Sequence, residues 1–136
     1  MERQSILLVE DNPDDVELTR RALNKNDVDF QMTVATDGEA ALDLLFGGAG
    51  RAAVQPAFLL LDLNLPKIDG LEILRRLRAH PQTRALPVIV MTGSQEEEAF
   101  LESCSLGVDA YVRKPVDIDQ IDAALRQLKL PSLLAG

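Results

Sequence analysis

The chain is poor in the residues that form covalent crosslinks and transition-metal sites. Its 136 residues include one cysteine, Cys104, and one histidine, His80. A single cysteine excludes an internal disulfide and is typical of a reducing compartment, so a cytoplasmic location is expected. Cys104 follows apolar residues of a predicted helix, which favours a small core residue over a reactive thiol. His80 falls at the predicted end of a helix, where a cation suits the dipole, and it is assigned no catalytic role.

Long apolar runs and an excess of basic residues are also missing. No segment approaches the roughly 20 apolar residues of a membrane-spanning helix, and the first residues lack the pattern of a secretory signal. With 22 acidic and 14 basic residues the formal net charge is -8, which disfavours nucleic acids and anionic membranes as direct partners. Basic residues that do gather beside Glu72 are interpreted as a solvated helix face: Arg75, Arg76 and Arg78.

What is present is the pattern of one α/β domain. The hydrophobic share of 46% argues against disorder, and we expect a core over about residues 4–129 with a tail over 130–136. Short apolar runs predict strands at 6–9, 30–35, 58–61, 87–91 and 110–112. A helix is predicted after each of them. This alternation implies a parallel sheet with helices on both faces.

Capping residues indicate where the helices begin. The expected caps are, in chain order, Asn12, Thr36, Asp69, Ser94 and Asp117. Thr36 and Ser94 are each followed by a glutamate three residues later, the spacing of a capping box. Asp14 and Asp15 are interpreted as acids that favour the dipole at the start of the first helix. The apolar stripe expected on that helix consists of Val16, Leu18, Ala22 and Leu23.

Reactive polar residues follow four of the predicted strands. They are Glu10 and Asp11 after the first strand, Asp62 after the third, Thr92 after the fourth and Lys114 just past the fifth. The carboxyl ends of parallel strands share one edge, so these side chains should meet there. Carboxylates crowded in this way repel by roughly 4 kcal/mol for each pair at about 4 Å and an effective dielectric constant near 20. A divalent cation would relieve that repulsion, and oxygen ligands favour Mg²⁺.

Such a magnesium site would attract a phosphoryl group. Lys114 can neutralise phosphoryl oxygens, the Thr92 hydroxyl can donate a hydrogen bond, and one carboxylate can act as nucleophile. Taken singly, each residue also has an ordinary interpretation: Asp62 as a turn cap, Thr92 as a strand-end hydroxyl, Lys114 as a surface lysine. Their combination favours a phosphoacceptor site on Asp62.

Four sequence segments carry most of these residues. They are L-L-V-E-D-N (7–12), L-L-L-D-L-N-L-P-K-I-D-G (59–70), V-I-V-M-T-G-S (88–94) and Y-V-R-K-P (111–115). In this order and spacing they resemble the receiver domains of two-component response regulators, the CheY-like group, over nearly the whole chain. The resemblance implies a flavodoxin-like five-stranded parallel sheet with strand order 2-1-3-4-5 and helices on both faces.

The resemblance also implies a role for each acidic residue of the site. Asp62 would be phosphorylated by a partner histidine kinase. Mg²⁺ would be bound by Asp11, Asp62 and the backbone carbonyl of Asn64, with Glu10 acting mainly through water. The chain would assist its own phosphorylation and dephosphorylation without being a turnover enzyme.

By the same resemblance, Thr92 and Lys114 would bind the phosphoryl oxygens. Thr92 and the aromatic Tyr111 would be the switch residues, and the Lys114–Pro115 peptide bond would be cis. Gly93 stands where many receivers carry alanine, serine or threonine. Without a side chain there, water or a phosphoryl donor can approach more easily, which bears on the lifetime of the phosphoryl group.

Other segments are similar to a narrower subset. They are N-P-D-D-V-E-L (12–18), the Gly- and Ala-containing loop before the third strand, D-L-N-L-P-K (62–67) and K-P-V-D (114–117). The subset consists of stand-alone receivers paired with phytochrome-type histidine kinases. With no DNA-binding segment expected, the signal would leave through a partner protein, and a histidine phosphotransfer protein is one route. Apolar residues of the tail fit a segment folded back on its own domain or, as the resemblance favours, a homodimer contact with the last strand and last helix: Leu130, Pro131, Leu133 and Leu134.

Two other functions use a similar architecture. A Mg²⁺-dependent phosphohydrolase with an aspartyl nucleophile would need a general-acid aspartate close after Asp62, and Asn64 stands two residues after it. A flavin-binding module would need a phosphate-cradling loop after the first strand, where E-D-N-P-D-D (10–15) would repel a phosphate. We therefore expect a phosphorylation-controlled switch.

Overall fold

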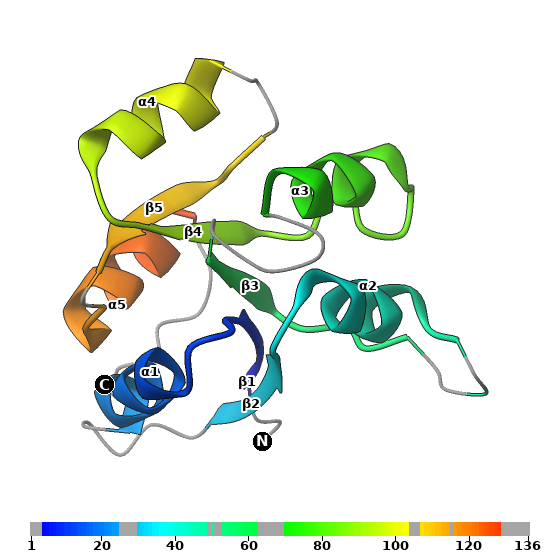
Figure 1. Ribbon diagram of the computed structural model, residues 1–136, viewed down its shortest axis with the longest axis horizontal. Coiled ribbons are helices and arrows are strands. Elements are labelled where there is room, and N and C mark those ends of the chain that lie inside the picture. Colours follow the sequence, from blue (N-terminus) through cyan, green and yellow to red (C-terminus); the bar gives the residue numbers. More distant parts are fainter. Residues whose placement is uncertain are drawn as a thin grey trace.

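The computed structural model describes residues 4–24, 30–48, 50, 53–62, 70–103, 107–114 and 116–128. Strands and helices alternate along this part of the chain, as predicted (Figure 1). The strands are β1 (Gln4–Val9), β2 (Phe30–Ala35), β3 (Phe58–Asp62), β4 (Val88–Thr92) and β5 (Ala110–Arg113). The helices are α1 (Pro13–Asn24), α2 (Gly38–Phe46), α3 (Gly70–Ala79), α4 (Gln95–Ser103) and α5 (Ile118–Gln127). Cys104 and the tail over 130–136 lie outside the described residues.

The strands form one parallel sheet in the order β2-β1-β3-β4-β5. This confirms the predicted flavodoxin-like topology. From β1 the chain first adds β2 on one side and then crosses to β3 on the other, where Val9 pairs with Leu61. The strand order therefore reverses between β1 and β3. Ligand sites of such sheets lie beyond the carboxyl ends of the strands at this point.

Helices cover both faces of the sheet with separate apolar layers (Figure 1). On one face α1 and α5 pack through Leu23, Ile121 and Leu125. On the other face α2, α3 and α4 contribute a longer set: Ala41, Leu42, Leu45, Ile73, Leu74, Leu77 and Leu101. Among the described residues, no helix combines the length and apolar character needed to cross a membrane.

The position of β3 at the centre of the sheet, between two layers of helices, explains why its sequence is a continuous apolar run. Phe58 and Leu60 belong to the layer under α1 and α5, whereas Leu59 and Leu61 belong to the opposite layer. All four are completely buried. Burying each such side chain stabilises the fold by about 1.5–3 kcal/mol. A strand that is buried on both faces does not alternate apolar and polar residues. In the sequence, β3 was therefore recognised by the short length of its apolar run and by the turn residues that follow it.

Three of the expected helix caps are confirmed, and they are Asn12, Ser94 and Asp117. The cap predicted at Thr36 is wrong. α2 begins one residue later, because the Asp37 carboxylate accepts a hydrogen bond from the Ala40 backbone N–H at 2.8 Å. Thr36 is exposed. The expected cap Asp69 lies outside the described residues.

The buried face of α1 differs from the predicted stripe. Leu18 is 52% exposed, whereas Thr19 is only 4% exposed. Positions 16, 19 and 23 share one face of a helix, and position 18 is turned away from that face. The Thr19 hydroxyl is satisfied internally, since it donates to the Asp15 carbonyl at 2.9 Å. At positions 18 and 19, the direction in which the helix turns each side chain therefore decides which residue is buried, and hydrophobicity does not.

Arg78 was predicted to share a solvated helix face with Arg75 and Arg76. The latter two are half-exposed and pair with Glu72 at 3.7 and 3.3 Å. Arg78 instead has a side chain only 18% exposed that pairs with Asp109 at 3.1 Å. The prediction is wrong for Arg78, because this side chain fastens α3 to the segment that leads into β5.

Candidate functional site

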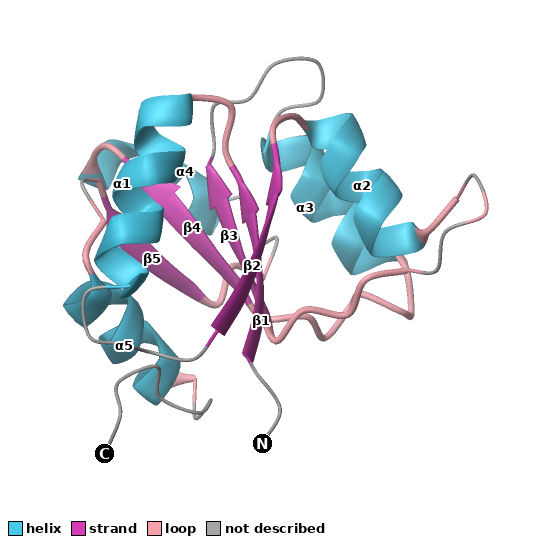
Figure 2. Ribbon diagram, turned by 90° about the horizontal axis from the view of Figure 1, so that it is seen from below, coloured by secondary structure: helices cyan, strands magenta, loops and turns pink. Residues whose placement is uncertain are grey.

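The carboxyl ends of the strands point to one edge of the sheet (Figure 2). The structure places four strand ends there with the residues singled out from the sequence. Glu10 and Asp11 directly follow β1, Asp62 is the last residue of β3, Thr92 is the last residue of β4, and Lys114 directly follows β5. Because β1 and β3 are neighbours in the sheet, their acidic side chains lie side by side.

Three carboxylates form the centre of this edge. Glu10, Asp11 and Asp62 each offer one oxygen, and these oxygens all lie within 4.8 Å of one another. Glu10 is 1% exposed and Asp62 is 5% exposed, whereas Asp11 is open to solvent. The Glu10 carboxylate also accepts a hydrogen bond from the Asn12 backbone N–H at 3.3 Å. The acidic side chains that follow β1 and β3 are therefore crowded and partly shielded from water.

Lys114 supplies a cation to this cluster. Its Nζ lies 3.1 Å from a Glu10 oxygen and 3.2 Å from a carboxylate oxygen of Asp62. Its backbone N–H donates to the Thr92 carbonyl at 2.9 Å, which holds the segment after β5 against the end of β4. The side chain remains 30% exposed. One ammonium therefore bridges two buried carboxylates while keeping a route to an incoming ligand.

The burial and crowding of these carboxylates change the pKa of Glu10. Burial, the hydrogen bond with Asp62 and the charge of Asp62 together raise the pKa of Glu10 from 4.5 to about 7. The hydrogen bonds from Lys114 and from the Asn12 backbone oppose this rise without cancelling it. For Lys114, burial alone would lower the pKa, but the hydrogen bond to Glu10 and the charges of Asp62 and Glu10 outweigh it, and the pKa is raised. Lys114 therefore stays charged, whereas Glu10 is only partly ionised near pH 7.

Asp15 also reaches this site, although the sequence suggested only a helix-start role for it. Its carboxylate lies 3.5 Å from Lys114 Nζ. The cavity beside Glu10, Asp15, Leu18 and Lys114 measures only ≈ 20 Å³. That volume is about the space needed for one water molecule. The sequence signal for Asp15 was its place in the first turn of the helix that follows the acidic pair.

Thr92 is held by the helix that follows it. It is 1% exposed, and its hydroxyl donates to a Glu98 carboxylate oxygen at 3.3 Å. The same Glu98 oxygen lies 3.6 Å from a guanidinium nitrogen of Arg113. Sequence reasoning missed Glu98, because only the helical phase of α4 turns position 98 towards the end of β4. An ideal Cβ at the exposed Gly93 would meet nothing closer than a Glu97 oxygen at 4.0 Å, so this side of the site is open.

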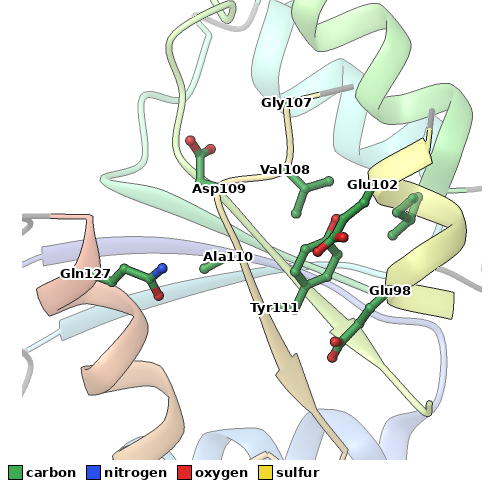
Figure 3. Close-up of a pocket in the computed structure, with 9 residues that line it drawn as sticks. Glu98, Glu102, Gly107, Val108, Asp109, Ala110, Tyr111 and Gln127 are labelled. Atoms are coloured by element: carbon green, nitrogen blue, oxygen red, sulfur yellow. The ribbon is translucent and has the colours of Figure 1, made fainter. Parts of the chain in front are cut away.

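Tyr111, the expected aromatic switch, is half-buried on β5 and packs against the layer under α4. It lines a groove of ≈ 540 Å³ between α4 and β5, together with Glu98 and Glu102 (Figure 3). Figure 3 shows the Tyr111 ring beside the carboxylates that α4 presents. Glu98 therefore contacts Thr92 and also lines the groove that holds Tyr111.

The donor set fits a hard divalent cation. Glu10, Asp11 and Asp62 provide oxygen ligands only, and oxygen ligands suit Mg²⁺ or Mn²⁺ better than zinc or copper. Asn64, whose carbonyl was expected to complete the set, lies outside the described residues, as does Pro115 with its expected cis peptide bond. A bound cation would offset the mutual repulsion of the carboxylates.

Known proteins match this arrangement over most of the chain. The solved structure of the bacteriophytochrome response regulator AtBRR is 42% identical in sequence, covers 100% of this chain, is itself covered to 99%, and has a TM-score of 0.91. The response regulator Rcp1 of Synechocystis sp. is 37% identical over 110 residues, which are 80% of this chain and 75% of Rcp1. Its Mn²⁺-bound structure has a TM-score of 0.76 at 32% identity and covers 97% of this chain and 99% of that one.

A phosphorylated structure is also among the matches. The cyanobacterial phytochrome response regulator RcpA, solved in its phosphorylated form, is 32% identical with a TM-score of 0.76 and covers 94% of this chain and 92% of its own. The family model described as the response regulator receiver domain matches residues 6–126. With this match, the parallel sheet and the acidic edge, the chain belongs to the family of response regulator receiver domains, and among solved structures it resembles those of phytochrome-associated regulators.

Proposed function

We propose that this chain is a single-domain response regulator that accepts a phosphoryl group on Asp62. The observation that carries the proposal is the position of Lys114, whose ammonium lies 3.2 Å from the Asp62 carboxylate at the edge of a three-carboxylate cluster. A nucleophilic carboxylate needs a nearby cation to bind the phosphoryl oxygens, and Lys114 supplies one. Glu10 and Asp62 both contact this cation, and the likeness to response regulator receiver domains favours Asp62 as the nucleophile.

In the proposed reaction an Asp62 oxygen forms a bond to phosphorus while the bond from phosphorus to a donor histidine nitrogen breaks. The electron pair of that bond stays on the imidazole. Lys114 binds one phosphoryl oxygen as negative charge approaches, and the Thr92 hydroxyl donates to another. Mg²⁺ held by the carboxylates of Asp11 and Asp62, with Glu10 acting through water, would supply the further positive charge that the crowded site needs.

The exposure of the acidic edge suits a donor carried by a protein. Asp11 is open to solvent, and the Lys114 side chain is 30% exposed. A phosphohistidine presented by a kinase needs no enclosed pocket, because the donor protein covers the site itself. The exposed Leu18, which lines a small cavity beside Glu10 and Lys114, offers an apolar contact for such a protein. Asn64 stands where a phosphohydrolase would need its general-acid aspartate, which favours a phosphoacceptor.

The partner we propose is a histidine kinase of phytochrome type. The support is the likeness to AtBRR and to phosphorylated RcpA, both of which are named as phytochrome response regulators. The Mn²⁺-bound form of Rcp1 supports a divalent cation at the acidic edge. Phosphoryl transfer from such a kinase, and onward transfer to a histidine phosphotransfer protein, would take place in the cytoplasm.

We also propose that residues 1–136 act as one receiver unit that forms a homodimer through β5, α5 and the tail. β5 is an edge strand of the sheet, and an unpaired strand edge is a common place for association. Equilibrium sedimentation of the chain with and without phosphorylation should show a dimer, and removal of the tail, residues 130–136, should weaken its association. A monomer at all concentrations would contradict this part of the proposal.

The central proposal is tested by labelling. Incubation with an acyl-phosphate donor and Mg²⁺ should add one phosphoryl group, seen as a mass increase, and Asp62→Asn should abolish it. Asp43→Asn, at an exposed position on α2, is the matched control and should label normally. Chelation of the metal should slow labelling of the unaltered chain. Undiminished labelling of Asp62→Asn would refute the assignment of Asp62.

A further inference from the structure

We propose that Glu98 is a positioning residue that holds the Thr92 hydroxyl in the unphosphorylated protein and must release it before Thr92 can bind a phosphoryl group. The inference rests on the proposed function and concerns the regulation of that site. Its basis is the hydrogen bond of 3.3 Å from Thr92 Oγ1 to Glu98 Oε1, made across the junction of β4 and α4.

The junction is built so that Glu98 faces Thr92. The Ser94 hydroxyl oxygen accepts from the Glu97 backbone N–H at 3.2 Å and fixes the first turn of α4. The Glu97 carboxylate accepts from the Gly93 backbone N–H at 2.9 Å and ties the helix back to the strand end. With both contacts made, position 98 lies one helical step further and directs its carboxylate to the side of Thr92. The local turn therefore places the acceptor beside the buried hydroxyl.

A hydroxyl carries one proton, so it can donate to only one strong acceptor at a time. Thr92 is 1% exposed, and water is therefore a poor substitute for Glu98 as its acceptor. A phosphoryl oxygen on Asp62 and the Glu98 carboxylate are both anionic and compete for the same proton. When Thr92 binds the phosphoryl group, it must therefore exchange one acceptor for another. The free energy needed to break its hydrogen bond with Glu98 reduces the net free energy gained from the new hydrogen bond.

The structure also provides a partner for Glu98 once Thr92 has left. Arg113 at the end of β5 has a guanidinium nitrogen 3.6 Å from the same Glu98 oxygen. The Glu98 side chain is 28% exposed, so its released carboxylate can be solvated as well. Because Glu98 lines the groove beside Tyr111 (Figure 3), the exchange also changes which charges face that groove. The site at Asp62 and the α4–β5 surface are in this way linked through one carboxylate.

Beryllofluoride, a phosphoryl mimic that binds an aspartate carboxylate, measures this competition at equilibrium. Calorimetric titration in the presence of Mg²⁺ should show that Glu98→Ala binds the mimic about fivefold more tightly than the unaltered chain, the scale expected for loss of one competing charged hydrogen bond. Glu98→Gln keeps an acceptor atom and should give a smaller gain. Glu102→Ala removes an acid from the same helix and the same groove and should give no gain.

The same substitution made in a Thr92→Ala variant distinguishes loss of the hydrogen bond from loss of the Glu98 charge. In Thr92→Ala the hydroxyl is absent, so Glu98→Ala should no longer tighten binding. An equal gain with and without the Thr92 hydroxyl would overturn the inference, because repulsion by the Glu98 charge would then explain it. A Glu98→Ala affinity equal to that of Glu102→Ala would also overturn it while leaving the proposed function intact. Failure of the unaltered chain to bind the mimic would instead overturn the proposed function, and the inference with it.

Discussion

The two edges of the sheet each carry a cluster of charged side chains, and the clusters are balanced in opposite ways. At the carboxyl edge, the ammonium of Lys114 lies beside Glu10, Asp62 and Asp15, and within the described part of the chain no other ammonium is paired with them. At the amino edge, Arg78 faces the carboxylate of Asp109. Among these side chains, the first cluster has three carboxylates and one ammonium, whereas the second has one carboxylate and one guanidinium.

The guanidinium of Arg78 is also extensively hydrogen-bonded. Its guanidinium donates to Asp109 at 3.1 Å and to carbonyl oxygens of Thr83, Arg84, Leu86 and Gly107 at 3.4, 3.0, 2.8 and 2.7 Å. The Asp109 carboxylate in turn accepts from the Val88 backbone N–H at 2.7 Å. α3, the start of β4 and the segment before β5 are therefore joined through a single side chain. These contacts contribute to the stability of this edge.

The carboxyl edge has the opposite properties. Burial, together with the neighbouring Asp62, raises the pKa of Glu10 to about 7 and so opposes full ionisation of the site. The fold tolerates this repulsion because β1 and β3, which carry the acids, are anchored by completely buried apolar residues. Unsatisfied charge would give the edge the affinity for a metal ion and a phosphoryl group that we propose. The comparison indicates that stability and function are assigned to opposite ends of the same strands.

The largest expected effect is at the amino edge. Arg78→Ala should lower the free energy of unfolding by about 3 kcal/mol, because Asp109 and several carbonyl oxygens lose their donor. Arg75→Ala, which removes a half-exposed arginine of the same helix, should change it by less than about 0.5 kcal/mol. Urea denaturation followed by circular dichroism measures both. Asp62 of the folded Arg78→Ala variant should still be labelled; loss of labelling without loss of stability would contradict the separation of the two edges.

The same substitution should have opposite signs at the two edges. Asp62→Asn removes one of the crowded carboxylates and should raise the metal-free free energy of unfolding by about 1.5 kcal/mol. Asp109→Asn should lower it by a similar amount, because Arg78 loses its counter-ion. Added Mg²⁺ should raise the melting temperature of the unaltered chain and of Asp109→Asn, but hardly that of Asp62→Asn. Destabilisation by Asp62→Asn would mean that its pairing with Lys114 outweighs the repulsion.

Local patterns in the sequence were sufficient for a parallel sheet with helices on both faces and for most of the carboxyl edge, whereas the strand order was predicted from the resemblance to receiver domains. Buried strands appear as apolar runs, and a parallel topology carries the residues after them to one edge, so Asp62, Thr92 and Lys114 could be placed without any long-range information. Their roles in phosphoryl transfer remain predictions. The carbonyl of Asn64 and the peptide bond before Pro115 lie outside the described residues.

The features that were missed depend on helical phase or on backbone partners. Whether position 18 or 19 of α1 is buried, and whether position 98 of α4 faces Thr92, is decided by rotations of 100° per residue that an uncertain helix start cannot fix. Arg78 was misjudged because it donates to four backbone carbonyls among the described residues, and a sequence carries no signal for carbonyl acceptors. Asp109 is 31 residues away and carries no pattern that links it to Arg78.

The smallest expected effect is the pH dependence of the metal-free protein. Glu10 has a pKa of about 7 in the folded state and 4.5 as its reference value, so between these pH values the folded protein holds a proton that the unfolded chain has lost. Stability therefore falls as pH rises through this window and levels off above it. From about pH 6 to about pH 8 the loss attributable to Glu10 should be about 1 kcal/mol.

Glu10→Gln should remove this part of the slope, whereas Asp43→Asn, at an exposed position on α2, should keep it. Mg²⁺ favours the ionised carboxylates, so the rise in melting temperature that it produces should be larger at about pH 8 than at about pH 6. Thermal melts at both pH values, with and without Mg²⁺, measure this directly. A metal effect independent of pH would mean that Glu10 is already ionised at the lower pH, and that the crowding at the carboxyl edge is weaker than the burial of Glu10 and its contact with Asp62 imply.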